Sequence, residues 1–397
     1  MDMPKKKAVA ECISDEALTH LKSYKYSAVD KSPVSKYILG PWWNAFVNVL
    51  PMWLAPNMVT LLGFFFILGN IVLMSIYIPD LIGPGPTWVY LSFSFGLFMY
   101  QTMDNVDGKQ ARRTGTSSGL GELFDHGIDS LNCTLASLLE TAAMGLGCSK
   151  LGVFTALCYF NGPTEGLLIA AAVMAVGGIW GPEVFRVPLK YAIGEKTLLA
   201  EFLGETNTLD IWVLVIVVPL CTGHIPVCVY NVWRARRAKG LPLAPVFLEW
   251  TPLAVYTLAI GAWIYSPYST LMDNNHLTLL CLTLSFVFGR MTTKMILAHL
   301  TRQPFPYWTV MLVPLLGGVV IGNLPLLGLP QISPQLELAY LWGYFVFAGI
   351  IYFRWAFLVV GSICEFLGIN ALTIPKAKQE ETRRRIEEEK ATQGRQD

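Results

Sequence analysis

Residues 54–78 read LAPNMVTLLGFFFILGNIVLMSIYI and contain no charged side chain. A helix of about 20 apolar residues crosses the hydrocarbon core of a membrane, which is roughly 30 Å thick. This stretch is therefore predicted to be a transmembrane helix. The whole chain has the same character: 53% of its 397 residues are hydrophobic, 14% are charged, and the mean hydropathy is +0.47. Soluble domains carry roughly 25% charged residues, so the composition argues against a water-soluble enzyme.

Further apolar runs follow, with their charged residues at the ends rather than the centres. They cover residues 87–103, 128–147, 165–180, 209–231, 246–267, 276–298, 306–328 and 338–362, with a shorter piece at 151–160. We predict an all-α polytopic membrane protein with about ten transmembrane helices. The net charge is +1, from 29 Lys and Arg against 28 Asp and Glu, so there is no basic excess that would indicate a nucleic-acid partner.

The distribution of Lys and Arg predicts the orientation of these helices, because cytosolic loops of membrane proteins are enriched in both residues. The loops at 79–86, 268–275 and 329–337 contain neither, whereas the loops after 87–103 and 209–231 are basic. The first 50 residues are polar and rich in Lys, which argues against a cleavable signal peptide. Both termini are therefore expected in the cytosol.

The same charge pattern requires residues 151–160 and 165–180 to be two separate crossings. Ten helical residues reach only about 15 Å, half of the hydrocarbon thickness. The crossing at 151–160 is thus predicted to be truncated.

The N-terminal segment, residues 1–50, combines aromatic residues with Lys. Tyr24, Tyr26, Trp42 and Trp43 are among them. Two interpretations are open: the segment lies at the headgroup level of the membrane, or it packs against the cytosolic ends of the helices.

Four aspartates follow the second apolar run: Asp104, Asp107, Asp125 and Asp129. The first two are three residues apart and the last two are four apart, so on helices each pair lies on one face. The stretch between them, 113–121, is rich in Gly, Ser and Thr and is predicted to be the turn of a helical hairpin. The two pairs of carboxylates are expected to face each other.

Carboxylates that lie this close repel each other and are costly beside a membrane unless a cation sits between them. Oxygen ligands without Cys or His favour Mg²⁺, Mn²⁺ or Ca²⁺ over zinc. Two such ions can hold the attacking and leaving oxygens of a phosphoryl transfer. Gly108 and Ala111 would let a substrate approach the helix, and Arg112 would neutralise a phosphate. The alternative is a helix end whose aspartates merely face cytosolic water, which explains four aspartates at this spacing less well.

The residues of this hairpin form a longer pattern, D-G-x-x-A-R, eight residues, then G-x-x-x-D-x-x-x-D. Its members are Asp107, Gly108, Ala111, Arg112, Gly121, Asp125 and Asp129, preceded by Asp104. The pattern resembles the signature of the CDP-alcohol phosphotransferase family (class I). The stretches at 54–60, 107–114, 121–127 and 162–166 resemble the eukaryotic cholinephosphotransferase and ethanolaminephosphotransferase branch of that family, and this likeness extends over most of the chain.

The resemblance implies an integral enzyme of the endoplasmic reticulum or Golgi membrane, with ten helices, a homodimeric assembly and an active site that faces the cytosol. Its implied reaction transfers phosphocholine or phosphoethanolamine from CDP-choline or CDP-ethanolamine to diacylglycerol. The products are phosphatidylcholine or phosphatidylethanolamine and CMP, and the cofactor is Mg²⁺ or Mn²⁺, as two ions. The implied parts are an interfacial segment at 1–50, catalytic helices at 51–182, helices for the lipid substrate and the dimer at 183–365, and a charged, solvated cytosolic tail at 366–397.

The resemblance also implies roles for individual residues. The metal ligands are Asp104, Asp107, Asp125 and Asp129. The residues near the cytidine and pyrophosphate are Asn57, Gly108, Ala111, Arg112 and Gly121.

A base must take the proton of the attacking diacylglycerol hydroxyl. Asp129 is the candidate in the family at large, but a carboxylate bound to metal is a weak base. His126, next to Asp125, is the better chemical choice, because an imidazole titrates near neutrality. The other role open to His126 is that of a hydrogen-bond partner of a carboxylate. The sequence leaves both His126 and Asp129 as catalytic candidates.

Two rival functions share part of this pattern. An enzyme that uses CDP-diacylglycerol and a soluble alcohol has the same signature, and only the flanking stretches argue against it. A membrane transporter explains ten helices but not four carboxylates on one hairpin, and no internal repeat or matched pair of broken helices indicates one. The sequence does not determine whether choline or ethanolamine is preferred.

The enzymes that this chain resembles carry a Trp-Glu-x-Tyr-His pattern at the cytosolic end of a full-length helix, before their Gly-Pro-Thr-Glu-Gly stretch. Here residues 157–163 read LCYFNGP, and that pattern is missing. Since the truncated crossing falls at the same place, the chain is predicted to be impaired. The alternative is that this crossing borrows residues from the preceding apolar run and thins the bilayer locally.

Overall fold

The computed structural model describes residues 14–23, 32–157, 164–193 and 204–393, and in these ranges every regular element is a helix. The α-helices are α2 (Asp15–Thr19), α3 (Gly40–Val49), α4 (Pro56–Tyr77), α5 (Thr87–Thr114), α6 (Gly119–Ala143), α7 (Lys150–Leu157), α8 (Glu165–Trp180), α9 (Leu189–Ile193), α11 (Thr208–Pro219), α12 (Ile225–Ala238), α13 (Ala244–Glu249), α14 (Thr251–Ile264), α15 (Leu277–Leu300), α16 (Leu312–Gly322), α17 (Pro334–Leu367) and α18 (Lys376–Gln393). Short 3₁₀ or π turns are η1 (His20–Ser23), η2 (Ser35–Leu39), η3 (Pro182–Arg186), η4 (Leu220–His224) and η5 (Leu324–Leu327).

Three of these helices, α4, α15 and α17, are long and apolar enough to cross a membrane. The helices α8, α14 and α16 are also apolar but shorter. The prediction of an all-α membrane protein is thereby confirmed at this coarser level. The predicted runs at 87–103 and 128–147 belong to α5 and α6, which are longer and carry the acidic residues on the same helices.

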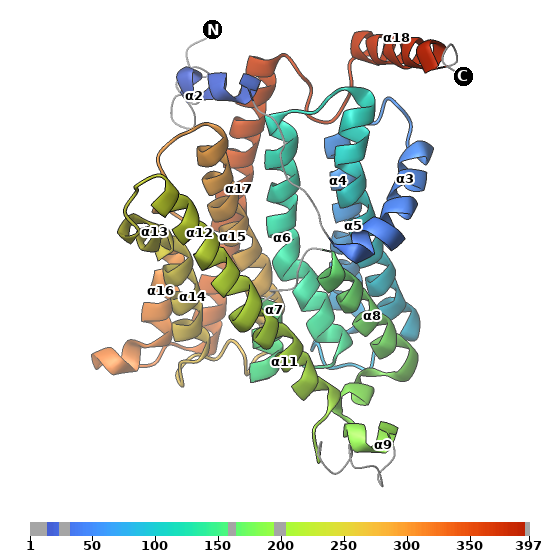
Figure 1. Cartoon of the computed structure of the whole chain (residues 1–397). Helices are drawn as coiled ribbons and strands as arrows, with labels where there is room; N and C mark the ends of the chain where they lie inside the picture. Colours follow the sequence, from blue (N-terminus) through green and yellow to red (C-terminus); the bar gives the residue numbers. More distant parts are fainter. Residues whose placement is uncertain (1–13, 24–31, 158–163, 194–203, 394–397) are drawn as a thin grey trace.

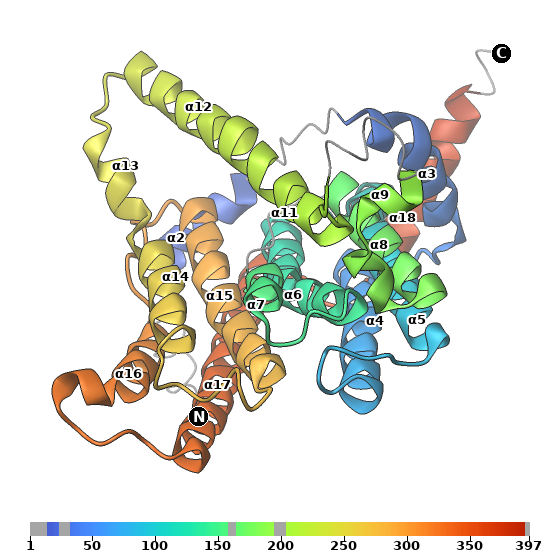
Figure 2. The ribbon, with the colours of Figure 1, turned by 90° about the horizontal axis from the view of Figure 1, so that it is seen from below.

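The predicted run at 209–231 is helical along its whole length, with a change of helix type in the middle. The α-helix α11 ends at Pro219, η4 follows directly as a π turn, and α12 continues with Pro226 at its second residue. Proline lacks the backbone donor that an α-helix interior needs, which accounts for the π turn between the two helices. No residue of α12 is buried, and Figure 2 shows α12 and α13 running along the outer edge of the molecule.

The helices α4, α5, α6 and α8 pack side by side into one bundle (Figure 1). Glycines bring α4 and α5 close together: a Cβ on Gly63 would lie 3.0 Å from Cβ of Met103, and one on Gly96 would clash with the side-chain amide of Asn70. That amide donates to the Ser92 carbonyl on α5 at 2.8 Å, so a polar contact locks the register of two apolar helices.

A second close contact joins this bundle to the C-terminal helices. A Cβ on Gly127 of α6 would lie 3.1 Å from Cγ2 of Thr293 on α15, and one on Gly289 of α15 would lie 2.9 Å from the Leu131 side chain. Two small residues, one on each helix, therefore let α6 and α15 touch, as is typical of membrane helices. Helix α17 packs against α15 and also contacts α6, and a Cβ on Gly289 would meet Tyr352 of α17 at 3.3 Å (Figure 1).

The helix α3 lies against the end of α5 that carries the basic residues. Trp42 Nε1 donates to Thr102 Oγ1 at 3.1 Å, and Lys109 Nζ donates to Asn44 Oδ1 at 2.8 Å. Arg113 Nη1 donates to the carbonyl of Val47 at 2.7 Å. These contacts pack α3 against α5, as one of the two interpretations of the N-terminal segment expects, and its position at the headgroup level stays a prediction. Tyr24 and Tyr26 lie outside the described residues.

Candidate active site

The acidic hairpin, which we define as α5 and α6, is built by two end caps. Helix α5 ends at Gly115, whose φ of +66° lies in the left-handed region, and Thr116 N donates to the Ala111 carbonyl at 2.9 Å. This is the usual glycine ending of a helix. Helix α6 begins at the N-cap Ser118, whose hydroxyl accepts from Gly121 N at 3.3 Å. Because the turn is only a few residues long, residues at similar distances from it lie side by side, Asp107 with Asp125 and Asp104 with Asp129.

The structure brings the four carboxylates together in one group, in which Asp107 is buried and the other three are partly exposed. Asp107 is 8% exposed. Asp104 and Asp125 contact each other through their side chains, and Oδ1 of each is buried without a hydrogen-bond partner. Buried acceptors that lack a donor are rare in proteins. A cation between the two helices would satisfy both atoms, so the donor set fits a metal site.

Burial is the main cause of the raised pKa values of the carboxyl groups at this site. It raises the pKa of Asp104 and Asp107 well above the ordinary value, and the neighbouring carboxylates raise both further. Burial together with the charge of Asp129 raises the pKa of Asp125 to about 6. These three residues lie between the predicted spans at 87–103 and 128–147. A bound cation acts in the opposite direction, because it favours the ionised form of each carboxylate.

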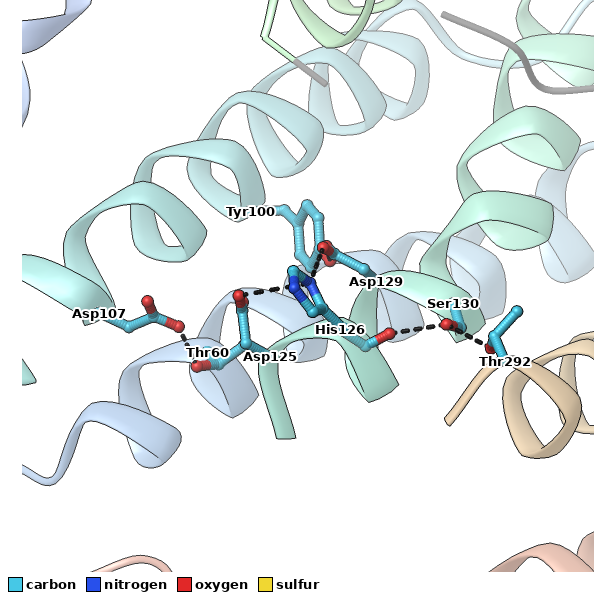
Figure 3. A network of polar contacts seen from close by, with 8 residues as sticks. All are labelled: Thr60, Tyr100, Asp107, Asp125, His126, Asp129, Ser130 and Thr292. Carbon is cyan, nitrogen blue, oxygen red and sulfur yellow. Dashed lines mark hydrogen bonds and ion pairs between the residues drawn. The ribbon is translucent and has the colours of Figure 1, made fainter. Parts of the chain in front are cut away.

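His126 lies between the last two aspartates, as Figure 3 shows. Its Nδ1 is 3.7 Å from Oδ2 of Asp125 and 3.7 Å from Oδ2 of Asp129. The interaction with Asp129 raises the pKa of His126 above its ordinary value. Asp129 has a second partner, because the phenol of Tyr100 donates to its Oδ1 at 2.5 Å.

Among the described residues, the tightest group able to hold a metal ion is Asp125, His126 and Asp129, whose ligand atoms lie within 4.8 Å of one another. This differs from the all-oxygen set predicted from the sequence, since it includes an imidazole and leaves out Asp104 and Asp107. The difference has a local cause: residues 125, 126 and 129 lie on one turn of α6, whereas Asp104 and Asp107 approach from α5.

Open space lies beside two of the residues that are predicted to contact the nucleotide, Gly108 and Gly121. A Cβ on Gly108 would come near only the Arg112 guanidinium, at 3.6 Å from Nη1. A Cβ on Gly121 would come near only Oδ1 of Asn57, at 3.8 Å. Arg112 is exposed and Ala111 is half-buried, one helical position away. The glycines therefore leave room beside a cationic and an amide group, as a phosphate and a base would need.

Four hydrogen bonds at the site are not indicated by the sequence pattern. The hydroxyl of Thr60 on α4 donates to Oδ2 of Asp107, and Tyr100 holds Asp129. The hydroxyl of Thr292 on α15 donates to Ser130 Oγ at 2.7 Å, and Ser130 in turn donates to the His126 carbonyl at 2.6 Å (Figure 3). One signal was available: Thr60 follows Asn57 by three residues, so both lie on one face of α4.

Comparison with known proteins agrees with this geometry. Residues 53–175, which include α4, the acidic hairpin and most of α8, match the CDP-alcohol phosphatidyltransferase family. The choline/ethanolaminephosphotransferase 1 of Arabidopsis thaliana is 33% identical over 92% of this chain and 98% of its own length. The choline/ethanolaminephosphotransferase 1 of Saccharomyces cerevisiae is 31% identical over 92% and 98%, and the ethanolaminephosphotransferase 1 of Homo sapiens is 30% identical over 79% and 84%.

The alignment with the Arabidopsis protein is 393 positions long, although it takes in only 92% of this 397-residue chain. It therefore includes positions at which the relative has a residue and this chain has none. Even so, the likeness extends over nearly the whole of both proteins. Unrelated proteins rarely reach this identity by chance over such a length. This chain belongs to the CDP-alcohol phosphatidyltransferase family.

Proposed function

We propose that the chain transfers phosphocholine or phosphoethanolamine from CDP-choline or CDP-ethanolamine to the free hydroxyl of diacylglycerol, with release of CMP. The observation that carries this proposal is the group of four carboxylates, one buried and three partly exposed, that the acidic hairpin brings together in a chain with long apolar helices. The names of the relatives, which cover choline and ethanolamine phosphotransferases, support the donor and leave the head group open.

Asp104, Asp107, Asp125 and Asp129 would hold two Mg²⁺ or Mn²⁺ ions. The unpartnered oxygens of Asp104 and Asp125 support this assignment. When bound, the ions supply positive charge to the pyrophosphate and to the leaving oxygen. Thr60 would keep Asp107 in place, since the hydroxyl already donates to one of its oxygens.

The donor nucleotide would lie over the glycines of the hairpin. Gly108 leaves space beside the Arg112 guanidinium, which would pair with a phosphate oxygen. Gly121 leaves space beside Asn57 for the cytidine. The small side chain of Ala111 would let the nucleotide approach the surface of α5.

Two residues compete for the proton of the diacylglycerol hydroxyl. One oxygen of Asp129 already accepts a hydrogen bond from Tyr100, and the other faces His126. The Nδ1 atom of His126 faces two carboxylates, which orient the ring and favour a proton on Nδ1. Its Nε2 would then be the free acceptor, and we assign the base role to this atom, with Asp129 as the group that orients the ring.

The membrane disposition is also part of the proposal. Ten crossings, cytosolic termini and an active site on the cytosolic face of the endoplasmic reticulum or Golgi would explain the alternation of basic and uncharged loops. The proposal also includes a homodimer. Its catalytic helices are at 51–182, the region for the lipid substrate and the dimer contact is at 183–365, and the tail is at 366–397.

The test uses the purified full-length chain in lipid vesicles, with labelled CDP-choline or CDP-ethanolamine, diacylglycerol, and either Mg²⁺ or EDTA. We expect labelled phosphatidylcholine or phosphatidylethanolamine together with CMP, in Mg²⁺ alone. A labelled lipid formed in EDTA would refute the metal site. Product formed instead from CDP-diacylglycerol and a free alcohol would refute the assigned substrates and establish the rival transferase.

A further inference from the structure

The C-terminal segment of the chain returns to the helices that carry the site. Thr373 forms an isolated antiparallel bridge with Leu54, just before α4 begins. The backbone carbonyl of Ala371 accepts a hydrogen bond from Asn57 Nδ2 at 2.9 Å. Residues that are more than three hundred positions apart in the chain therefore meet at the first turn of α4.

The bond to Ala371 determines which end of the Asn57 amide faces the site. The amino group of Asn57 is used by a backbone acceptor, so its Oδ1 is the atom that points toward α6, where a Cβ on Gly121 would lie 3.8 Å away. Asn57 is 8% exposed, which restricts its rotation. Asn57 Oδ1 therefore presents a hydrogen-bond acceptor with a fixed direction to the space beside Gly121.

Helix α18 holds the same segment against the end of α5. Thr382 is 3% exposed, and its hydroxyl donates to the Thr114 carbonyl at 2.8 Å. Arg385 Nη2 donates to the Arg113 carbonyl at 3.4 Å, so a cation lies at the negative end of the α5 dipole. Gly115 makes room for this contact, because a Cβ there would lie 3.1 Å from Arg385 Nη1. Figure 1 shows α18 lying across the turn end of the hairpin.

A link within the segment joins these two contacts. Gln379 Nε2 in the first turns of α18 donates to the Ile374 carbonyl at 2.7 Å, and Ile374 is buried. Of the residues of α18 up to Glu388, most are exposed, including Arg383, Arg384 and Arg385. The described part of the helix thus adds little to the apolar core, and its buried hydrogen bond to the hairpin is the one from Thr382 to α5.

We propose that residues 371–385 are a positioning segment of the nucleotide site, in which Ala371 orients Asn57 and Thr382 fixes the segment on the end of α5. The proposal rests on the proposed function, because that function places cytidine beside Asn57 and Gly121. Asn57 would then present its Oδ1 to a donor group of the nucleotide base, and Thr382 would act through Asn57 rather than touch the substrate.

The test compares Thr382→Val, which removes the hydroxyl at nearly constant volume, with Thr382→Ser, which keeps it. A chain that ends at Pro375 removes α18 but keeps the Ala371 carbonyl. Arg385→Ala is matched by Arg384→Ala, because Arg384 is a neighbouring exposed arginine and the hydrogen bond to the end of α5 comes from Arg385. For each purified protein, CMP binding in Mg²⁺ is measured, together with kcat and the KM values for the CDP-alcohol and for diacylglycerol.

We expect Thr382→Val to weaken CMP binding and raise the CDP-alcohol KM about threefold, and the shortened chain about tenfold, as expected for the loss of one or two hydrogen bonds. The KM for diacylglycerol should stay the same, and Thr382→Ser and Arg384→Ala should behave as the unmodified chain. CMP binding that is unchanged in Thr382→Val and in the shortened chain would overturn the inference. The inference would also be overturned if these variants lost kcat and thermal stability while CMP binding and the CDP-alcohol KM stayed unchanged.

The two proposals fail in different ways. If the unmodified chain does not use a CDP-alcohol, the proposed function fails, while CMP binding by the variants still tests the positioning segment. If the unmodified chain is active and the Thr382 variants bind CMP equally well, only the further inference fails.

Discussion

The phenol of Tyr100 on α5 donates a hydrogen bond of 2.5 Å to Oδ1 of Asp129 on α6. Tyr100 is 1% exposed, so the bond is made inside the protein, where a polar contact is strong. The other oxygen of Asp129 faces His126 Nδ1 at 3.7 Å. One carboxylate is thus held from α5 while it orients a ring on its own helix, which links the two halves of the acidic hairpin.

Tyr100→Phe should lower kcat about tenfold, because Asp129 loses the donor that fixes its position, and a net hydrogen bond to a charged group is worth about 1.5–3 kcal/mol. The measurement is turnover at saturating substrates. Tyr90→Phe is the matched control, since Tyr90 is an equally buried tyrosine of α5 whose hydroxyl accepts from Gly85 N at 2.9 Å, far from the aspartates. Equal turnover for the two variants would remove Tyr100 from the site.

Asp107→Asn and Asp125→Asn should abolish turnover while the protein still inserts into membranes. An amide does not replace a charge at a metal site, and the lost stabilisation should reduce the rate at least about a hundredfold. The exposed residue Asp273 supplies the control, as Asp273→Asn should keep full activity. The prediction is wrong if either hairpin variant retains more than about a hundredth of the unmodified rate.

Thr60→Val should raise the Mg²⁺ concentration needed for half-maximal activity. The hydroxyl of Thr60 donates to Asp107, and removing such a partner of a metal ligand typically costs about 10- to 100-fold in metal affinity. Saturating Mg²⁺ should restore most of the turnover, and Thr60→Ser should resemble the unmodified chain. A Mg²⁺ titration curve that does not move in Thr60→Val would show that this hydrogen bond leaves the metal site unaffected.

His126→Ala should slow the chemical step more than it weakens CDP-alcohol binding, because a base acts in the transition state. General-base catalysis contributes about 10² to 10⁴ in rate. Single-turnover kinetics with CMP binding measured in parallel separates the two effects. If the variant turns over at the unmodified rate, the base is Asp129, and His126 only pairs with its neighbouring carboxylates.

The hairpin was predictable because the evidence for it is local. Spacings of three and four residues put each pair of aspartates on one helix face. The turn predicted at 113–121 is present but shorter, since α5 extends to Thr114 and α6 begins at Gly119. Tyr100 was missed because it sits in an apolar run, where a tyrosine is usually core. Thr382 was missed because it lies in a charged stretch without a pattern, and its partner Thr114 is 268 residues away. Contacts between distant elements leave no periodic signal in the sequence.

The predicted truncated crossing leads to the last prediction, that this chain turns over more slowly than a version carrying an added family-like segment after Cys158. The described part of α7, Lys150–Leu157, has eight residues, which extend about 12 Å as a helix. Residues 158–163 lie outside the described residues. The relatives carry positions that this chain lacks, in agreement with a missing piece.

Both versions should be assayed in the same vesicles with CDP-alcohol, diacylglycerol and Mg²⁺. A full-length crossing would let α8 begin at the cytosolic face without thinning the bilayer, and the Trp-Glu-x-Tyr-His pattern would add polar side chains close to the acidic hairpin. An insert of the same length with that pattern replaced by alanines separates the two effects, since it restores the span alone. If the chain without an insert matches both, then the fourth crossing borrows residues from its neighbour at little cost, and the chain is a complete enzyme as it stands.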